Sequence, residues 1–446
     1  MKTIEIIGGG TISHVRNHLA LCAPAYGTTA RKMSDLLRKK LGIDMAEAQA
    51  REYGYWPSNM EYMVNLHLTK MAGGENLETN EDVSKLVDGL ITNPNTKIIF
   101  FNPALVDFNG AVTTSGPIGC EWSNDITTKS GKYEERLKTS KGEQSMLLWP
   151  SEKIIGRIRK ERKDIFLIAF KTTCGATEDD QFLTGLHLLK SNSCNLVLAN
   201  DTKYRRNMII TPEQARYCVT TDRELALKTL VDIAISRSKG HFTRSTVVPG
   251  DLIPWDMENI PHSLKAVVEH CIANGAYKPF KGSTVGHFAF KKSETDFITS
   301  KRKTDFNQLS TVGMVHCHAE NDDEVVAYGA KPSVGGQSQR IIFKDHPEMD
   351  SVVHFHCPPK SESVAGDISI RSQYAHECGS HECGQNTSDG LREAAPGIKC
   401  VYLDNHGPNI VFNHKTDPRD VIAFIDRNFD LSKSTDQVDR NQVRVS

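Results

Sequence analysis

The stretch Ser351–Cys357 joins a strand-forming pattern to two histidines, and this combination limits what the chain around it can fold into. Its two valines and its phenylalanine favour a short buried β-strand. Because side chains alternate between the two faces of a strand, His354 and His356 are predicted to point the same way. Two imidazoles on one face make a poor apolar core but a good pair of metal ligands.

A third histidine, His406, follows in the stretch Leu403–Phe412, where a Gly-Pro pair marks a turn before another strand. Three histidines with an open coordination position suit a catalytic divalent metal that polarises a carbonyl group. The alternative is that His354, His356 and His406 are unrelated polar residues, two of them on a half-exposed strand. Spacing alone leaves both interpretations open.

Length and composition narrow the class of protein. A chain of 446 residues is too long for one typical core, so two or three domains are expected. A net charge of −1 argues against a nucleic-acid or membrane-surface binder, and no apolar run approaches the length of a membrane span. The N-terminus begins with a strand pattern rather than a signal peptide, and 11 cysteines follow no framework. We therefore expect a cytoplasmic protein with reduced thiols and small-molecule substrates.

Strands and helices alternate through the first half of the chain. Buried strands are predicted at Lys2–Ile7, Lys97–Phe101, Asp164–Phe170 and Asn195–Ala199, with helical patterns between them. This alternation is typical of an α/β fold with a doubly wound, Rossmann-like sheet, which binds its ligand at the carboxyl ends of the strands.

A glycine-rich segment, Gly8, Gly9 and Gly10 followed by Thr11, comes directly after the first predicted strand. A turn of this kind ahead of a helix suits a nucleotide or phosphate, because bare backbone N–H groups can approach the anion. The GxGxxG pattern is missing, so a dinucleotide-binding fold is not indicated.

The segment Ile168–Thr173, the helix after it and Leu198–Asp201 resemble the phosphopantothenate–cysteine ligase family, also called phosphopantothenoylcysteine synthetase, of coenzyme A biosynthesis. Gly8–Thr11 resembles the Gly-Gly-Thr start of that family. Asn102–Asp107 sits where the family has an Ala-Ala-Val-x-Asp nucleotide loop. The resemblance covers roughly residues 1–240.

The resemblance implies a ligase that activates a carboxylate as an acyl-nucleotide, using CTP or ATP with Mg²⁺, and lets an amine displace the nucleotide. Such chemistry needs positioning and charge stabilisation rather than a protein nucleophile. It implies that Lys138 meets phosphate charge, that Asp107 meets a base amino group or Mg²⁺, and that Asn17 meets an acyl oxygen. The implied nucleotide-binding residues are Gly8, Gly9, Gly10, Thr11, Ala104, Asp107, Phe170, Lys171 and Asn200.

Two features depart from that family. The Ser-Ser-Gly-Lys/Arg anion loop is absent, with Ala25–Lys32 as the nearest substitute, and a Glu-Thr pair is replaced by Thr172–Thr173. Without the resemblance, Lys138 is a residue of a charged surface loop and Asp107 a residue of a strand-end turn.

The second half resembles the class II aldolase/adducin family over about residues 258–430. The evidence is an ordered set of motifs: Gly282–Ser283, Ile298–Ser300, Lys331–Ser333, His354–His356, Tyr374–Ala375 with Gly379–Glu382, and Asn405–Gly407. In that family a divalent metal, usually Zn²⁺, chelates a hydroxy-carbonyl substrate and stabilises the enediolate of aldol cleavage or related chemistry.

This resemblance implies an α/β/α domain with His354, His356 and His406 as metal ligands, and a homo-oligomer, either a dimer or a tetramer. The implied substrate-binding residues are Gly282, Ser283, Ser300 and Ser333. Members that cleave carbon–carbon bonds carry a Glu after the Pro-Ser-Ser turn, where this chain has a glycine near Gly335. Glu362 could substitute, or it could be a solvated residue of a polar loop.

Two further histidine clusters need weighing. His376–Cys378 and His381–Cys383 repeat a His-Glu-Cys unit that could hold a second, structural zinc, or could begin a helix beside the active site. The pair His316 and His318 is a second His-x-His, and we interpret it as structural.

The sequence therefore predicts four segments: a nucleotide-binding domain at 1–240, a linker at 241–257, a metal-binding domain at 258–430 and a polar tail at 431–446. The predicted function is a bifunctional metabolic enzyme, a nucleotide-dependent carboxylate–amine ligase fused to a metal-dependent aldolase-like lyase. The alternative is a catalytically degenerate protein that sequesters a nucleotide or a phosphorylated small molecule.

Overall fold

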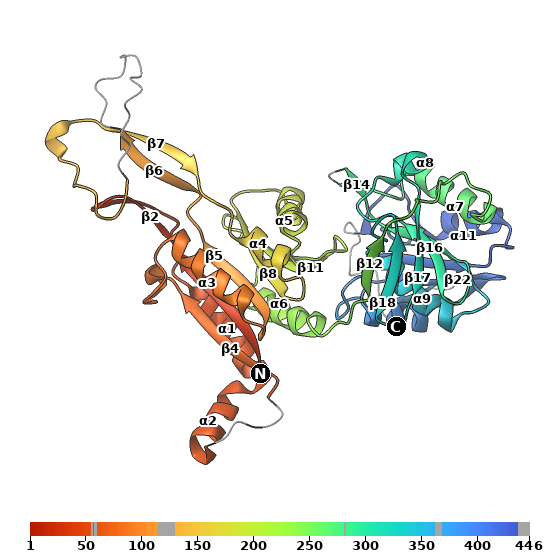
Figure 1. The fold of residues 1–446 in the computed structure, drawn as a ribbon, viewed down its shortest axis with the longest axis horizontal. Coiled ribbons are helices and arrows are strands. Elements are labelled where there is room, and N and C mark those ends of the chain that lie inside the picture. The colour runs from red at the N-terminus through yellow and green to blue at the C-terminus, as the bar shows by residue number, and fades with distance from the viewer. Residues whose placement is uncertain (55–56, 58–59, 114–129, 281, 362–367, 436–446) are drawn as a thin grey trace. The chain divides into compact units, whose positions relative to one another are not determined.

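The computed structural model describes residues 1–435 except 55–56, 58–59, 114–129, 281 and 362–367 (Figure 1). The chain divides into two compact units. The first consists of Met1–Thr211 and Tyr217–Ala234, and the second of Pro212–Arg216 and Ile235–Ser446. The second unit is thus built from two separate stretches of chain. The predicted domain limits at 240, 257 and 430 stay predictions.

A seven-stranded sheet forms the centre of the first unit (Figure 1). Its strands, in sheet order, are β11 (Arg216–Thr220), β10 (Asn207–Ile210), β9 (Leu196–Asp201), β8 (Phe166–Thr173), β5 (Thr96–Ala104), β1 (Lys2–Gly10) and β4 (Tyr62–Leu68). The strands from β9 to β4 run parallel, and β10 pairs antiparallel with β9. The centres of β9, β8 and β5 are buried apolar runs, as expected of a parallel sheet covered on both faces, whereas the edge strand β4 is mostly half-buried.

Helices cover both faces of this sheet. They are α1 (Thr28–Leu41), α3 (Asn80–Thr92), α4 (Ile155–Glu161), α5 (Glu178–Asn192) and α6 (Arg223–Arg237), whereas α2 (Ile43–Tyr53) follows α1 and extends away from the sheet (Figure 1). Helices α3, α4 and α5 are neighbours, whereas α1 is tied to α6 by an ion pair between Lys40 and Asp232. Right-handed crossovers place these two groups on opposite faces, because the chain reverses its direction across the sheet at β1. The doubly wound α/β fold is therefore confirmed.

The predicted glycine turn is wrong, because Gly8, Gly9 and Gly10 continue strand β1. A Cβ atom at Gly8 would lie 2.3 Å from the Cβ of Ala30 in α1, and one at Gly10 would lie 1.9 Å from the carbonyl oxygen of Ala23. These glycines therefore serve the close approach of neighbouring segments. A hairpin of β2 (Ile12–Arg16) and β3 (Leu19–Cys22) follows them before α1 begins.

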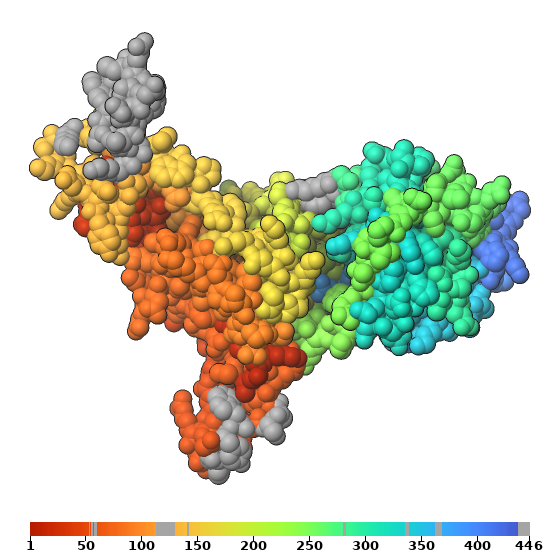
Figure 2. Space-filling model, in the orientation of Figure 1, coloured from red at the N-terminus to blue at the C-terminus, as the bar shows by residue number. Residues whose placement is uncertain are grey.

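A second hairpin, β6 (Phe108–Thr113) and β7 (Ser145–Pro150), projects from the sheet of the first unit (Figures 1 and 2). Every residue of β7 is exposed, including four large apolar side chains. Strand β6 packs against the β2–β3 hairpin, whereas β7 leaves its apolar side chains exposed, which makes it an unusual surface.

We expect Gly10→Ala to destabilise the first unit by at least about 2 kcal/mol, because the added methyl group meets backbone atoms of Ala23 and Ala25 that cannot rotate away. The matched control is Gly89→Ala in α3, where nothing lies within 4 Å of the added atom and helix propensity favours alanine. Urea unfolding of both variants measures the difference. Equal stability of the two variants would contradict the packing role of Gly10.

A ten-stranded sheet forms the centre of the second unit. Its strands, in sheet order, are β12 (Arg244–Val248), β18 (Glu324–Tyr328), β17 (Met314–Ala319), β16 (Asp296–Ser300), β15 (His287–Lys291), β19 (Ser351–His354), β23 (Gly407–Phe412), β22 (Ile398–Leu403) and β20 (Ser369–Arg371), with β21 (Arg392–Ala395) also paired to β22. The pairings from β18 through β22 are antiparallel.

Helices lie on both faces of this second sheet. They are α7 (His262–Ala273), α8 (Leu309–Val312), α9 (Val334–Asp345), α10 (His381–Gly390) and α11 (Pro418–Asn428). One buried cluster joins α7 and α11 to Val353, and the other joins α9 and α10 to Val352. Neighbouring residues of β19 thus face different helix layers, and the predicted α/β/α architecture is confirmed. Among the described residues, no helix is both long and apolar enough to cross a membrane.

Two predicted elements differ from the structure. The segment 241–257, predicted as a linker, contains β12, which pairs with β18 at the edge of the second sheet. The predicted strand 282–290 is interrupted: β14 (Ser283–Thr284) pairs with β13 (Pro279–Phe280), and β15 begins at His287. The break falls at Gly286, whose φ of 110° and close approach to the carbonyl oxygen of His354 suit no other residue.

Candidate metal centre

Strand β19 and the residues after it position the first two histidines. Val352 and Val353 anchor β19 in the core, and β15 and β23 pair with its two edges. His354 and His356 point the same way, as their spacing predicts, with ring centroids 5.0 Å apart. His354 Nδ1 donates a hydrogen bond of 2.7 Å to the carbonyl oxygen of Pro408. The other ring nitrogen, Nε2, therefore keeps a free lone pair.

The turn between β22 and β23 brings in His406. Asn405 has a φ of 55°, and the amide N–H of His406 donates to the carbonyl oxygen of Leu403. Gly407 follows with a φ of 144°, and a Cβ atom there would lie 2.1 Å from the carbonyl oxygen of Phe355. The glycine after His406 therefore lets this turn lie directly against the residues that follow β19.

The three histidines form one buried cluster. Their ring centroids lie 4.6 to 5.0 Å apart, and one nitrogen from each ring lies within 4.8 Å of the others. His354, His356 and His406 are 1%, 6% and 2% exposed. Among the residues that the structure describes, no other group of histidine, cysteine or acidic side chains meets these distances.

Burial favours the neutral form of His354 and His406. It lowers the pKa of His354 to about 4, against a small opposing effect of its hydrogen bond to Pro408. Burial also lowers the pKa of His406 well below its ordinary value, and the neighbouring histidines lower it further. A neutral imidazole is the form that binds a metal. His354 Nε2 and both ring nitrogens of His406 are buried without a hydrogen-bond partner, so the residues present fit a divalent metal with nitrogen ligands.

His287, which the sequence reasoning missed, lies beside this cluster. It starts β15 opposite His354, and the two ring centroids are 4.6 Å apart. Burial lowers the pKa of His287 well below its ordinary value. The side-chain amide of Gln339 in α9 contacts His287 Nδ1. The alternating run His287–Lys291 could have revealed it, but the predicted strand began too early, at residue 282.

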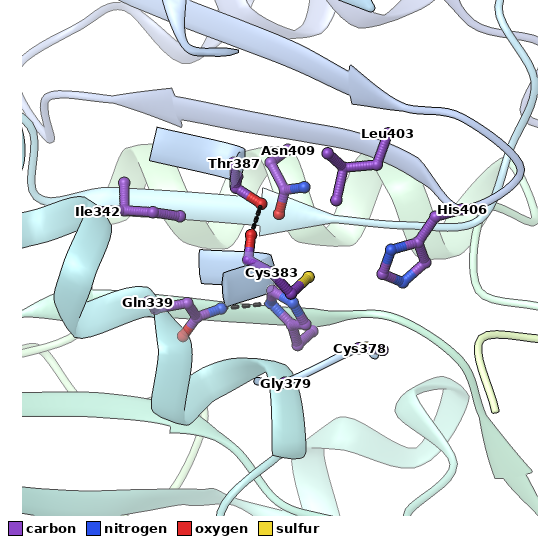
Figure 3. A pocket seen from close by; sticks show the side chains of 10 residues that line it. Gln339, Ile342, Cys378, Gly379, Cys383, Thr387, Leu403, His406 and Asn409 are labelled. Atoms are coloured by element: carbon purple, nitrogen blue, oxygen red, sulfur yellow. Dashed lines mark hydrogen bonds between the residues drawn. The ribbon is translucent and has the colours of Figure 1, made fainter. Parts of the chain in front are cut away.

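A small pocket opens next to His406 (Figure 3). Helices α9 and α10 and the turn before α10 supply much of its lining, which comprises His287, Gln339, Ile342, Cys378, Gly379, Cys383, Thr387, Leu403, His406 and Asn409. Figure 3 shows His406 and Cys383 facing the same space. None of these lining residues is a carboxylate, which agrees with the absence of the Glu from the Pro-Ser turn.

The predicted substrate residues divide into two pairs. Ser300 ends β16 with a fully buried hydroxyl that has no hydrogen-bond partner, and its carbonyl oxygen accepts from the amide of Ser333 at 2.9 Å. The structure thus brings Ser300 and Ser333 together. Gly282 and Ser283 instead lie at the small β13–β14 hairpin. Glu362, the predicted substitute for the missing Glu, lies outside the described residues.

The other histidine clusters do not gather into metal sites among the described residues. His316 and His318 both contact Asp296 Oδ1, at 2.9 and 3.2 Å, which agrees with a structural role. In the predicted second zinc motif, Glu382 pairs with His241, and His381 contacts the hydroxyl of Thr243. These side chains therefore have other partners.

In the first unit, several predicted nucleotide-binding residues meet at the carboxyl ends of the parallel strands. Gly10 lies in register with Ala104, and the amide of Thr11 donates to the carbonyl oxygen of Ala104 at 3.0 Å. The strands β1 and β5 are the place where the strand order reverses, which is where open α/β sheets bind ligands. Phe170, Lys171 and Asn200 lie near the carboxyl ends of β8 and β9.

The three predicted ligase residues are exposed. Asn17 lies in the turn of the β2–β3 hairpin, and Lys138 lies in the segment before β7. Asp107 lies between β5 and β6, where its carboxylate accepts from Lys153 Nζ at 2.6 Å. Their roles stay predictions.

Comparison with solved structures finds proteins of both families that the sequence resembles. The DNA/pantothenate metabolism flavoprotein from Streptococcus pneumoniae is 16% identical over 52% of this chain and 97% of its own, with a TM-score of 0.40. The C-terminal domain of the coenzyme A biosynthesis bifunctional protein CoaBC is 14% identical over 52% of this chain and 94% of its own, with a TM-score of 0.33.

A third neighbour, an L-fuculose 1-phosphate aldolase, is 17% identical over 38% of this chain and 82% of its own, with a TM-score of 0.28. No protein-family model matches the chain, and no curated protein matches its sequence. The two predicted resemblances are thus found again among solved structures, as likenesses of fold alone.

We expect the metal-free protein to lose stability as the pH falls from 6.5 towards 4. The unfolded chain protonates His354 near pH 6.5, whereas the folded protein does so near 4, so stability that is complete above pH 6.5 is lost through this window. For His354 alone the loss reaches about 3 kcal/mol. Urea-dependent hydrogen exchange of β19 and β23 measures it after chelator treatment.

A matched His354→Gln variant should show a shallower pH dependence. Unfolding free energies that stay constant between pH 6.5 and 4.5 in the native sequence would contradict the burial of neutral rings.

Proposed function

We propose that the second unit is a divalent-metal enzyme of the aldolase-like lyase type, acting on a small hydroxy-carbonyl compound. One observation carries this proposal: His354 and His406 present buried, neutral ring nitrogens that no protein group satisfies. Burying polar atoms without partners costs free energy, and a metal ion such as Zn²⁺ would offset that cost.

His354, His356 and His406 would hold the metal. A bound divalent ion supplies Lewis-acid polarisation of a carbonyl or hydroxyl oxygen. The carbonyl oxygen of Pro408 fixes the ring orientation of His354 and keeps its proton on Nδ1, which is a common arrangement behind metal-bound histidines. The burial of all three rings excludes water from their nitrogens.

His287 lies beside the cluster, against His354, and contacts the side-chain amide of Gln339. If the amide nitrogen of Gln339 donates to His287 Nδ1, the proton of the neutral ring sits on Nε2. We propose that His287 orients the substrate through that N–H group. Ser300 adds an unsatisfied hydroxyl in the same unit.

Metal content gives the direct test. The native protein should bind about one zinc ion per chain, and His354→Ala or His406→Ala should weaken zinc binding by more than about 100-fold, because each removes a direct ligand. His316→Ala is the matched control, since it alters the other His-x-His pair, which contacts Asp296. Elemental analysis and competition with a chelator measure the effect. Retention of zinc in both cluster variants would refute the proposal.

A second candidate function concerns the first unit, which we propose to be a nucleotide-dependent carboxylate–amine ligase using CTP or ATP with Mg²⁺. It is favoured by the N-terminus of α1, which has no side-chain cap, and by the buried hydroxyl of Thr69, which has no hydrogen-bond partner. Thr69 lies against Gly9, at the carboxyl ends of β1 and β4. A phosphate group would satisfy such donors.

Pyrophosphate release tests this second function. With Mg²⁺, 4′-phosphopantothenate and cysteine, the native protein should release pyrophosphate from CTP or ATP, and Lys138→Ala should lower the rate about 100-fold through loss of phosphate charge stabilisation. Lys160→Ala, at an exposed lysine of α4, is the matched control. A folded protein that releases no pyrophosphate with either nucleotide, yet binds them, would favour the sequestering protein instead.

Two accompanying predictions belong to the same proposal. The chain is proposed to act as a homo-oligomer, which the exposed apolar strand β7 supports. It is also proposed to act in the cytoplasm on small molecules, without nucleic-acid or membrane partners.

A further inference from the structure

A fully buried ion pair that is not part of the histidine cluster lies in the second unit. Arg237, the last residue of α6, and Glu213 have side chains that are 0% exposed. Arg237 Nη2 donates to Glu213 Oε1 at 2.7 Å, and Nη1 donates to Oε2 at 3.1 Å. A buried pair of this kind costs much desolvation energy, so it adds little to stability compared with apolar residues and needs another explanation.

The same guanidinium also fixes a neighbouring piece of backbone. Arg237 Nε donates to the carbonyl oxygen of Tyr374, and Nη2 donates to that of Gln373, both at 3.2 Å. Glu213 orients the planar guanidinium through two of its N–H groups, and these two carbonyl groups each accept from another. Arg237 therefore joins Glu213 to the start of the segment Gln373–Cys383.

That segment leads directly to the metal pocket, and we call it the pocket wall. The fully buried side-chain amide of Gln373 donates to the carbonyl oxygen of His376 at 2.8 Å and to Cys383 Sγ at 3.3 Å. Cys378, Gly379 and Cys383 line the pocket beside His406 (Figure 3). An unbroken series of hydrogen bonds thus runs from Glu213 to the lining of the pocket.

The pocket wall has little freedom to shift at its other end. Gly379 has a φ of 85°, and a Cβ atom there would lie 2.2 Å from the side chain of Val334 at the start of α9. Helix α9 also carries Gln339, the partner of His287. A displacement of the pocket wall would therefore be passed to the residues on the opposite side of the pocket.

We propose that Arg237 and Glu213 are positioning residues that hold the pocket wall and so determine which small molecules the metal pocket admits. Neither residue lines the pocket, so their effect is indirect. The inference rests on the proposed metal function in one respect: it treats the pocket as the place where the substrate reaches the metal. The position of the pocket wall itself can be measured without any metal.

The test uses two full-length variants. Glu213→Gln keeps the shape of the side chain but removes the charge that orients Arg237, and Arg237→Met removes the guanidinium while keeping a long apolar side chain. Glu348→Gln is the matched control, because Glu348 pairs with Lys399 in the same unit and does not line the pocket.

Two measurements follow on each variant. The first is the rate at which iodoacetamide labels Cys383, read by peptide mass spectrometry in metal-free protein. The second is a Co²⁺ titration followed by addition of acetohydroxamate, a small bidentate metal ligand, with the Co²⁺ absorption spectrum as the signal.

We expect Glu213→Gln to raise the labelling rate of Cys383 by at least about tenfold, because breaking a buried pair frees the segment that it holds. Co²⁺ affinity should stay within about twofold of the native value, while the acetohydroxamate affinity changes by at least about tenfold. Arg237→Met should do the same, and Glu348→Gln should match the native protein.

Labelling and acetohydroxamate binding that match the native protein in a folded Glu213→Gln variant would overturn the proposal. So would a loss of Co²⁺ binding in that variant, since the pair would then support the histidine cluster rather than the pocket wall. If the native protein binds no Co²⁺, the proposed metal function fails, and the labelling rates still decide the role of Arg237. If Arg237→Met does not fold, Glu213→Gln alone decides it.

Discussion

The burial of neutral imidazole rings without a protein partner for their lone pairs is the constraint on which the second unit depends. Removing such nitrogens from water costs free energy. Among the described residues, no hydrogen bond offsets this cost at His354 Nε2 or at His406. The fold nevertheless holds these rings in place. The carbonyl oxygen of Pro408 fixes the ring of His354, and the close approach of Gly407 to Phe355 brings His406 beside it. An arrangement that is costly for stability and rigid in geometry is typical of a site kept for a ligand.

The two units treat their candidate ligands in opposite ways. In the second unit the ring nitrogens of His354 and His406 are buried, with a small pocket beside His406. In the first unit Asn17, Asp107 and Lys138, the residues of the proposed nucleotide site, are exposed at loops and hairpins. The closed site suits a resident cofactor, and the open one suits a substrate that is consumed.

Local pattern was enough to predict those parts of the fold and site that depend on residues close in sequence. Alternation along one strand placed His354 and His356 on the same side, and alternating strands and helices predicted the doubly wound sheet. The errors arose where distant residues decide. Glycine is needed at positions 8 and 10 because Ala30 and Ala23 pack against them. A glycine run that resembles a turn in the sequence is therefore part of a strand.

His287 and β12 were missed for a similar reason. Gly286 breaks the alternation just before His287, and only the register of β15 against β19 reveals that this histidine faces His354. The strand β12 is short and largely exposed, so it carries no buried apolar run, and it pairs with the edge of β18. His406 was a candidate ligand from the sequence itself, but only the family resemblance favoured it over an unrelated histidine, since it lies 50 positions after His356 and no periodicity connects them.

The discontinuous second unit has an evolutionary consequence. Residues 212–216 leave the sheet of the first unit, contribute Glu213 to the second, and return to the first sheet as β11. A recombination event that exchanged either half of the gene near residue 240 would keep Glu213 with Arg237 but separate Arg237 from the backbone of Gln373 and Tyr374 that it contacts. The two halves are therefore expected to have been inherited and to have diversified as one block, although each resembles a family that occurs on its own.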